Sequence, residues 1–103
     1  LGEAHPDTLV SAFYNAFTIR RLGEPMKAAE VLRRFAYQSD EAMDKLGYNL
    51  ACYECLSGNE AKAKNLLTEI IHKHPERKEQ ALTDEDLISI REFIETLLNP
   101  KNY

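Results

Sequence analysis

Two cysteines and two histidines are the residues of this chain whose spacing first suggests chemistry. Cys52 and Cys55 are three positions apart, and His72 and His74 follow them. A Cys-x-x-Cys pair followed by two histidines provides the ligands of many zinc sites. However, residues two apart on a helix point to different sides of it, and the gap between the pairs is not that of a zinc finger. We therefore expect no bound metal, and we expect both thiols to pack in a core or a groove.

The cysteines are also expected to remain unpaired. Helical neighbours three positions apart keep their Cβ atoms about 5–6 Å apart, whereas a disulfide prefers about 3.5–4.5 Å. Free thiols are typical of a reducing compartment, so the predicted location is cytoplasmic.

The acidic and basic residues form no catalytic pattern. Asp84, Glu85 and Asp86 stand at a predicted helix start, where negative charge is favourable. The sequence contains no glycine-rich phosphate loop, no nucleophile elbow and no HExxH motif. We predict no catalytic residue, no cofactor and no enzyme activity.

Length and composition indicate one folded domain. The chain has 103 residues, of which 44% are hydrophobic and 29% are charged. The net charge of −4 argues against a nucleic-acid partner. No apolar run approaches the roughly 20 residues of a membrane span, so no membrane partner is expected. Because the sequence opens at Leu1 without a methionine, we expect an upstream region.

Hydrophobic periodicity and helix-end residues divide the chain into helices. Gly23 and Gly58 suit helix C-termini, Pro25 suits a first helical turn, and Ser39 and Asn59 suit N-caps. The pattern predicts helices over about 7–21, 25–37, 41–56, 60–73 and 84–98. The last is expected to cap the fold, because it is apolar on one side and acidic on the other, after a charged stretch at 76–80.

The first four helices form two copies of one pattern, thirty-five residues apart. The matched pairs are Ala16 and Ala51, Gly23 and Gly58, Ala28 and Ala63, and Leu32 and Leu67. Self-similarity at this period is typical of stacked helical repeats. The short connections require successive helices to lie antiparallel.

The segment 48–63, YNLACYECLSGNEAKA, resembles a tetratricopeptide repeat (TPR), and LGEAHPDT at 1–8 is similar to the LGxxHPDT linker of kinesin light chains and their bacterial relatives. The resemblance covers about 1–75. It implies an all-α, TPR-like right-handed α-solenoid with repeats at about 7–38 and 41–75 and a capping helix at about 84–98. It also implies that the chain is the C-terminal part of a longer array.

Two residues depart from the family pattern. Asn15 stands where the family usually has leucine, and Glu54 stands where it usually has a bulky apolar or aromatic residue. Either side chain could be buried and in need of a hydrogen-bond partner. Alternatively, the last helix docks differently and leaves Glu54 in water.

The resemblance implies that the first helix of each repeat lines a concave groove that holds a partner peptide or helix. Phe13, Phe17 and Arg20 share one helical face, and Tyr48, Cys52 and Cys55 occupy the equivalent positions thirty-five residues later. The predicted partner-binding residues are Val10, Phe13, Phe17, Arg20, Lys45, Tyr48, Asn49 and Cys52. The competing interpretation is that the aromatic residues are only core.

The predicted function is that of a non-catalytic protein–protein interaction module with a protein or peptide ligand. Phe13 and Phe17 occupy positions where chaperone-binding members of the family need a basic residue and an asparagine, so heat-shock chaperone tails are not expected as ligands. The alternative function is a structural or assembly segment that joins repeats in a larger protein or self-associates, including as a homodimer through the first helix.

Overall fold

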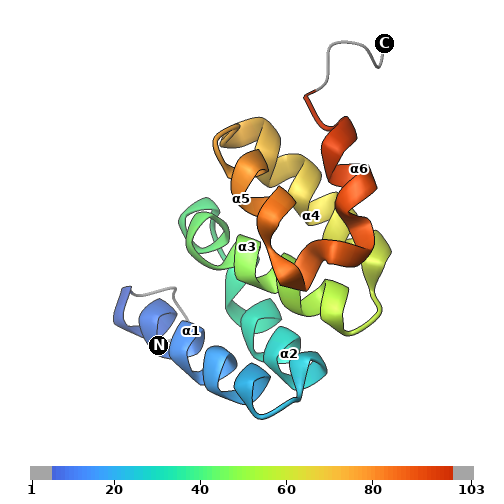
Figure 1. Cartoon of the computed structure of the whole chain (residues 1–103). Coiled ribbons are helices and arrows are strands. Elements are labelled where there is room, and N and C mark those ends of the chain that lie inside the picture. The colour runs from blue at the N-terminus through green and yellow to red at the C-terminus, as the bar shows by residue number, and fades with distance from the viewer. Residues whose placement is uncertain (1–5, 99–103) are drawn as a thin grey trace.

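The computed structural model describes residues 6–98, and every regular element in that range is helical. The first five residues of the LGxxHPDT linker lie outside the described range. None of the helices between residues 6 and 98 combines the length and the hydrophobicity that a membrane span requires. The elements are α1 (Pro6–Arg21), α2 (Pro25–Ala36), α3 (Asp40–Leu56), α4 (Glu60–Lys73), α5 (Arg77–Thr83), the 3-10 helix η1 (Glu85–Ile90) and α6 (Arg91–Thr96) (Figure 1).

The first four helices occupy the predicted ranges, and local chemistry explains their ends. Gly23 and Gly58 follow α1 and α3 with φ of 87° and 89°, in the left-handed region that costs other residues about 1–2 kcal/mol. Pro25 opens α2. The Ser39 hydroxyl accepts a hydrogen bond from the backbone N–H of Ala42 at 3.0 Å and so caps α3.

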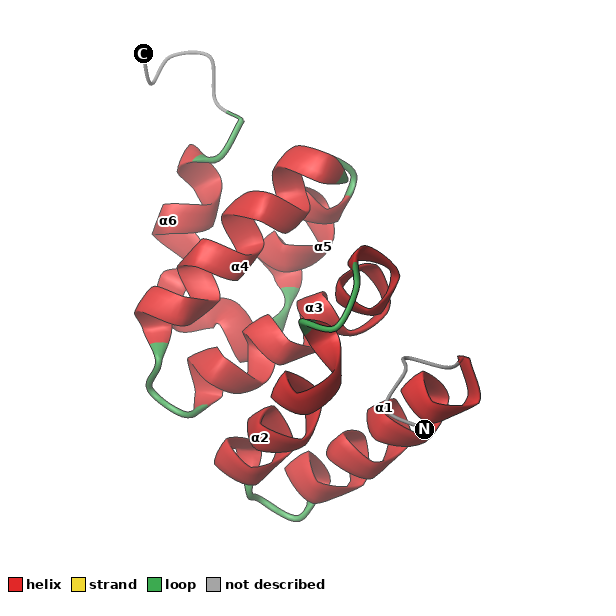
Figure 2. Ribbon diagram, turned by 180° about the vertical axis from the view of Figure 1, so that it is seen from behind, coloured by secondary structure: helices red, strands yellow, loops and turns green. Residues whose placement is uncertain are grey.

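Helices α1 to α4 pack as neighbours in chain order. Helix α2 contacts both α1 and α3, and α3 also contacts α4 (Figure 2). Fully buried alanines, including Ala28, Ala51 and Ala63, lie where the helices approach closely. The space between the helices is filled by buried leucines and one isoleucine: Leu9, Leu32, Leu46, Leu50, Leu67 and Ile71.

The chain after residue 75 differs from its prediction. The expected single helix over 84–98 is instead the 3-10 helix η1 followed by α6, and the charged stretch before it forms the short helix α5. Asp84 starts η1 by accepting the backbone N–H of Asp86 at 3.0 Å. Leu87 and Ile90 are both buried, and the three-residue period of a 3-10 helix places them on one face.

Helix α5 could not be recognised from hydrophobic periodicity, because Ala81 is its one fully buried residue. Tertiary contacts hold it instead. The Lys78 ammonium donates hydrogen bonds to the carbonyl oxygens of Glu95 and Leu97, which ties α5 to the end of α6. We refer to residues 77–98 as the C-terminal segment.

Candidate functional site

Helices α1 and α3 border a trough that contains all the residues predicted to bind a partner. One hollow of about 220 Å³ is lined by Leu9, Val10, Phe13, Tyr14, Lys45 and Leu46. A second hollow of about 180 Å³ is lined by Phe17, Arg20, Tyr48, Asn49, Cys52, Tyr53, Gln80, Asp84 and Asp86. Together these two sets of residues define the α1–α3 trough.

The part of the trough formed by α1 is open and aromatic. Val10 and Phe17 are 52% and 41% exposed, and Phe13 is half-buried. The rings of Phe13 and Phe17 stack with centroids 6.2 Å apart and an interplanar angle of 10°. The Arg21 guanidinium lies 5.8 Å from the centroid of the Phe17 ring. This half therefore offers apolar and aromatic area bordered by positive charge.

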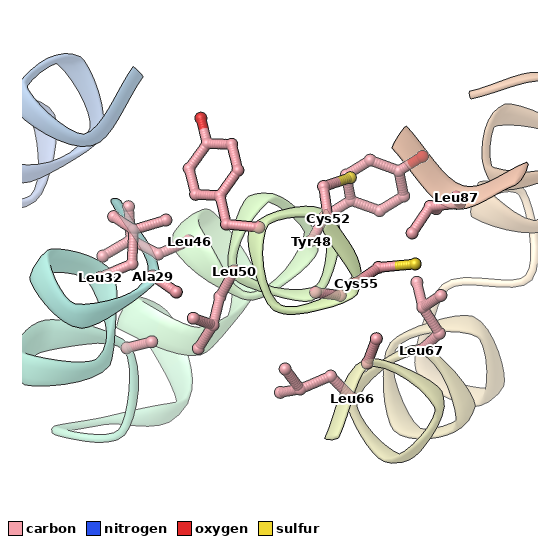
Figure 3. Packing of buried hydrophobic residues seen from close by; sticks show 14 of the residues in the cluster. Ala29, Leu32, Leu46, Tyr48, Leu50, Cys52, Cys55, Leu66, Leu67 and Leu87 are labelled. Carbon is pink, nitrogen blue, oxygen red and sulfur yellow. The ribbon is translucent and has the colours of Figure 1, made fainter. Parts of the chain in front are cut away.

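The part of the trough formed by α3 is closed by the C-terminal segment. Tyr48 and Cys52 are buried, with 5% and 4% of their surface exposed. The Tyr48 hydroxyl donates to Asp84 Oδ2 at 2.9 Å, and the Cys52 thiol lies 3.7 Å from the same oxygen. In Figure 3, Tyr48, Cys52 and Cys55 lie on the Leu87 side of α3, whereas Leu46 and Leu50 lie toward α2.

An ion pair fastens the C-terminal segment to α1 as well. Arg20 Nη2 donates to Asp86 Oδ1 at 2.7 Å, which links α1 to η1 across the trough. This hydrogen bond raises the pKa of Arg20 above its ordinary value. From α5, the Arg77 guanidinium lies 5.2 Å from the centroid of the Tyr48 ring.

The predicted groove is therefore not open along its whole length. Val10, Phe13, Phe17, Lys45 and Asn49 remain accessible to a partner in whole or in part. The covered members are Tyr48 and Cys52, with Arg20 engaged by Asp86. Sequence reasoning missed Gln80, Asp84 and Asp86 because they are more than thirty residues from α3 partners such as Tyr48 and follow no shared periodicity.

Cys52, Asp84 and Asp86 form the one cluster of metal-ligand types in the part of the chain that the structure describes, with their atoms within 4.8 Å of one another. Protein donors already contact this cluster, since Arg20 and Tyr48 donate to the two carboxylates. Burial raises the pKa of the Cys52 thiol, so it keeps its proton. Through these hydrogen bonds the cluster holds the C-terminal segment against α1 and α3.

The burial of Cys52 and Tyr48 in this cluster predicts a loss of stability at alkaline pH. Burial raises the pKa of Cys52 above 9.0 and that of Tyr48 above 10.0, their ordinary values. Above these values the unfolded chain loses protons that the folded chain keeps, so the free energy of unfolding falls as pH rises. Thermal melts at increasing pH should show this fall. It should be shallower in Tyr48→Phe, whereas the exposed Tyr14→Phe should retain it; equal slopes in both variants would contradict a buried Tyr48 hydroxyl.

Glu54 lies on the face of α3 opposite Cys52. It is one of the two departures from the repeat pattern, and the structure shows that it is buried with hydrogen-bond partners. Only 1% of it is exposed, and Arg33 Nε and Nη2 donate to its two oxygens at 2.7 and 3.1 Å. Asn59 Nδ2 donates to Glu54 Oε1 at 2.9 Å, so the Asn59 side chain binds Glu54 and does not cap α4. Burial alone would raise the pKa of Glu54, but the hydrogen bonds from Arg33 and Asn59 outweigh it and lower the pKa. Asn15, the other departure, is exposed.

Comparison of the chain with protein-family models, with curated proteins and with solved structures gave no match in any of the three.

Proposed function

We propose that the chain is a non-catalytic, TPR-like helical-repeat module that binds a partner peptide or helix in the open half of the α1–α3 trough. The observation that carries this proposal is the Phe13–Phe17 stack, in which Phe17 is exposed and Phe13 is half-buried and shares a hollow of the trough with Lys45. Monomeric proteins seldom leave contiguous aromatic area in water, and such area commonly marks a binding surface.

The arrangement of the helices supports a repeat solenoid. Helices α1 and α2 form one antiparallel pair, α3 and α4 form another, and α2 packs between α1 and α3. The two glycines with positive φ, Gly23 and Gly58, end the first helix of each pair and are thirty-five residues apart. In this proposal the C-terminal segment is the end cap of the array, and it covers the trough of the second pair.

The lining residues favour a ligand with bulky apolar side chains and a nearby carboxylate. Val10, Phe13 and Phe17 supply the apolar contacts. Lys45 is exposed, and its ammonium is 3.9 Å from Glu41, a weak surface pair that a ligand carboxylate could replace. The two free cysteines suit a reducing compartment, and we assign the module to the cytoplasm on that ground.

Selection of ligands from a random-peptide phage library, followed by binding measurements on the isolated peptides, tests the proposal. Phe17→Ala should weaken binding about thirtyfold, the loss expected for an aromatic anchor worth about 2 kcal/mol. Because Phe17 is partly exposed, the melting temperature should change little. The matched control is Tyr37→Ala, which removes an exposed aromatic side chain at the end of α2, outside the trough.

Two results would count against the proposal. One is a library that yields no peptide above background. The other is a set of peptides whose affinity falls equally in the Phe17 and Tyr37 variants.

A second candidate function is assembly of several copies through α1. A specific observation favours it: the exposed large apolar residues of the first helix pair extend beyond the trough, to Leu22 in the turn and Met26 on α2. Apolar surface of this extent suits contact with another helix.

A further inference from the structure

A third hollow, larger than either of the two in the trough, is a cleft of about 580 Å³ between α2 and α4, with α3 at its base. We call it the α2–α4 cleft. It lies on the opposite face of α3 from the trough, because Met43 and Glu54 are about half a helical turn away from Tyr48 and Cys52 around the α3 axis. Its apolar lining residues are Ala36, Tyr37, Met43, Leu66 and Ile70.

The two ends of this cleft differ in charge. Arg33 and Lys62 lie at one end with Glu54, whose charge is balanced by the Arg33 guanidinium. Asp40 and Glu69 lie at the other end: Glu69 follows Lys62 by seven residues on α4, and Asp40 is the first residue of α3, just beyond the turn that ends α2. Helices α2 and α4 run in the same direction, since both are antiparallel to α3. Seven helical residues span about 10 Å, so the cleft is basic at one end and acidic about 10 Å away.

Helix α1 carries a face that is complementary to this cleft. Val10, Tyr14, Phe17 and Arg21 recur at i, i+4, i+7 and i+11 and are all exposed. The row is apolar over three residues and ends in a positive charge. Tyr14 and Arg21 are seven residues apart, the same spacing that separates the basic end of the cleft from its acidic end.

We propose that α1 of a second copy of this chain docks in the α2–α4 cleft. Its direction is parallel to α2 and α4, with Arg21 beside Asp40 and Glu69 and with the Tyr14 ring toward Lys62. The charge pattern selects this direction, because the reverse direction places Arg21 beside Arg33 and Lys62. The proposal rests on the assembly role given above as the second candidate function.

This contact joins two different surfaces. Each copy that donates α1 still has an empty cleft, and each copy that offers its cleft still has a free α1. Association therefore continues beyond the dimer as concentration rises. It also covers Phe17, so assembly and ligand binding in the trough compete.

Sedimentation velocity over a range of protein concentrations tests the proposal. The unmodified chain should gain mass with concentration, and added salt should oppose the gain. Arg21→Glu and Glu69→Lys should each weaken association by roughly tenfold or more, because each places like charges together. An equimolar mixture of the two variants should associate again, since the unaltered α1 of Glu69→Lys meets the unaltered cleft of Arg21→Glu, and the two reversed charges face each other in the other pairing.

Glu92→Lys is the matched control, because it reverses an exposed charge on α6 away from both surfaces. A chain that remains monomeric at every concentration overturns the proposal, as does equal association of all variants. These outcomes are separate from failure of the trough proposal. At concentrations low enough to keep the chain monomeric, Lys45→Glu should weaken peptide binding and Glu69→Lys should not. At higher concentrations, Glu69→Lys should weaken self-association and Lys45→Glu should not.

Discussion

Arg33→Met is expected to lower the free energy of unfolding by about 3 kcal/mol at neutral pH, the cost of leaving a buried charge without its partner. Glu54 is almost fully buried and accepts two of its three hydrogen bonds from Arg33. Without that guanidinium, the carboxylate keeps one amide donor, from Asn59, to offset its burial. Urea denaturation of both proteins measures the difference.

The pH dependence of this loss identifies its cause. In the unmodified chain the pKa of Glu54 lies below its ordinary value of 4.5, so the ion pair stabilises the fold above that pH and less as pH falls through the lowered pKa. In Arg33→Met, burial without the cation raises the pKa, so the folded variant gains a proton that the unfolded chain does not hold. The difference between the two proteins should therefore shrink as pH falls below about 4.5.

Two further variants control this experiment. Arg34→Met alters the exposed neighbouring arginine and should change stability by less than about 0.5 kcal/mol. The double variant Arg33→Met, Glu54→Gln removes both charges and should recover part of the loss. If Arg33→Met and Arg34→Met cost the same, the buried ion pair does not stabilise the fold.

Leu87→Ala is expected to cost about 2–5 kcal/mol and to expose the cysteines of α3. Leu87 is fully buried, and it anchors η1 on the face of α3 that carries Tyr48, Cys52 and Cys55 (Figure 3). Its truncation weakens the packing that holds the C-terminal segment over the trough. Reaction of the native protein with a thiol reagent should therefore be faster in the variant than in the unmodified chain, whose thiols are buried.

Ile88→Ala is the matched control for this substitution. Ile88 is the next residue of η1 and is 55% exposed, so its truncation should change stability by less than about 0.5 kcal/mol. Thiol reactivity in this variant should equal that of the unmodified chain. Rapid labelling of the unmodified chain, or equal effects of the two truncations, would show that the C-terminal segment does not seal α3.

The four long helices could be predicted because each carries its own local signals. An apolar stripe, a glycine after the first helix of each pair, and a proline or serine at a start are all properties of adjacent residues. Helix α5 has no such stripe, and the change from α to 3-10 geometry at Asp84 depends on what Leu87 and Ile90 meet on α3. The predicted capping helix was therefore wrong in its internal structure, although the segment does pack against α3.

The residues of the trough that follow the repeat pattern of α1 and α3 could be predicted for a similar reason, but their exposure could not. Helical periodicity places Phe13, Phe17 and Tyr48 on matching faces of α1 and α3. Whether those faces meet water depends on Asp84 and Asp86, which are distant in sequence and belong to no repeat. The partner of Glu54 could not be predicted from the sequence for the same reason. Arg33 is twenty-one residues away, and only the packing of α2 on α3 brings the two together.

The most direct test of partner binding in the half-open trough is amide chemical-shift mapping by NMR of the chain with a library-selected peptide. We expect the perturbed amides to cluster on the trough side of α1, around Val10, Phe13 and Phe17, and around Lys45 on α3, while the amides of η1 and α6 stay unchanged. Perturbations centred on the α2–α4 cleft, or on the C-terminal segment, would contradict a ligand site in the open half of the trough.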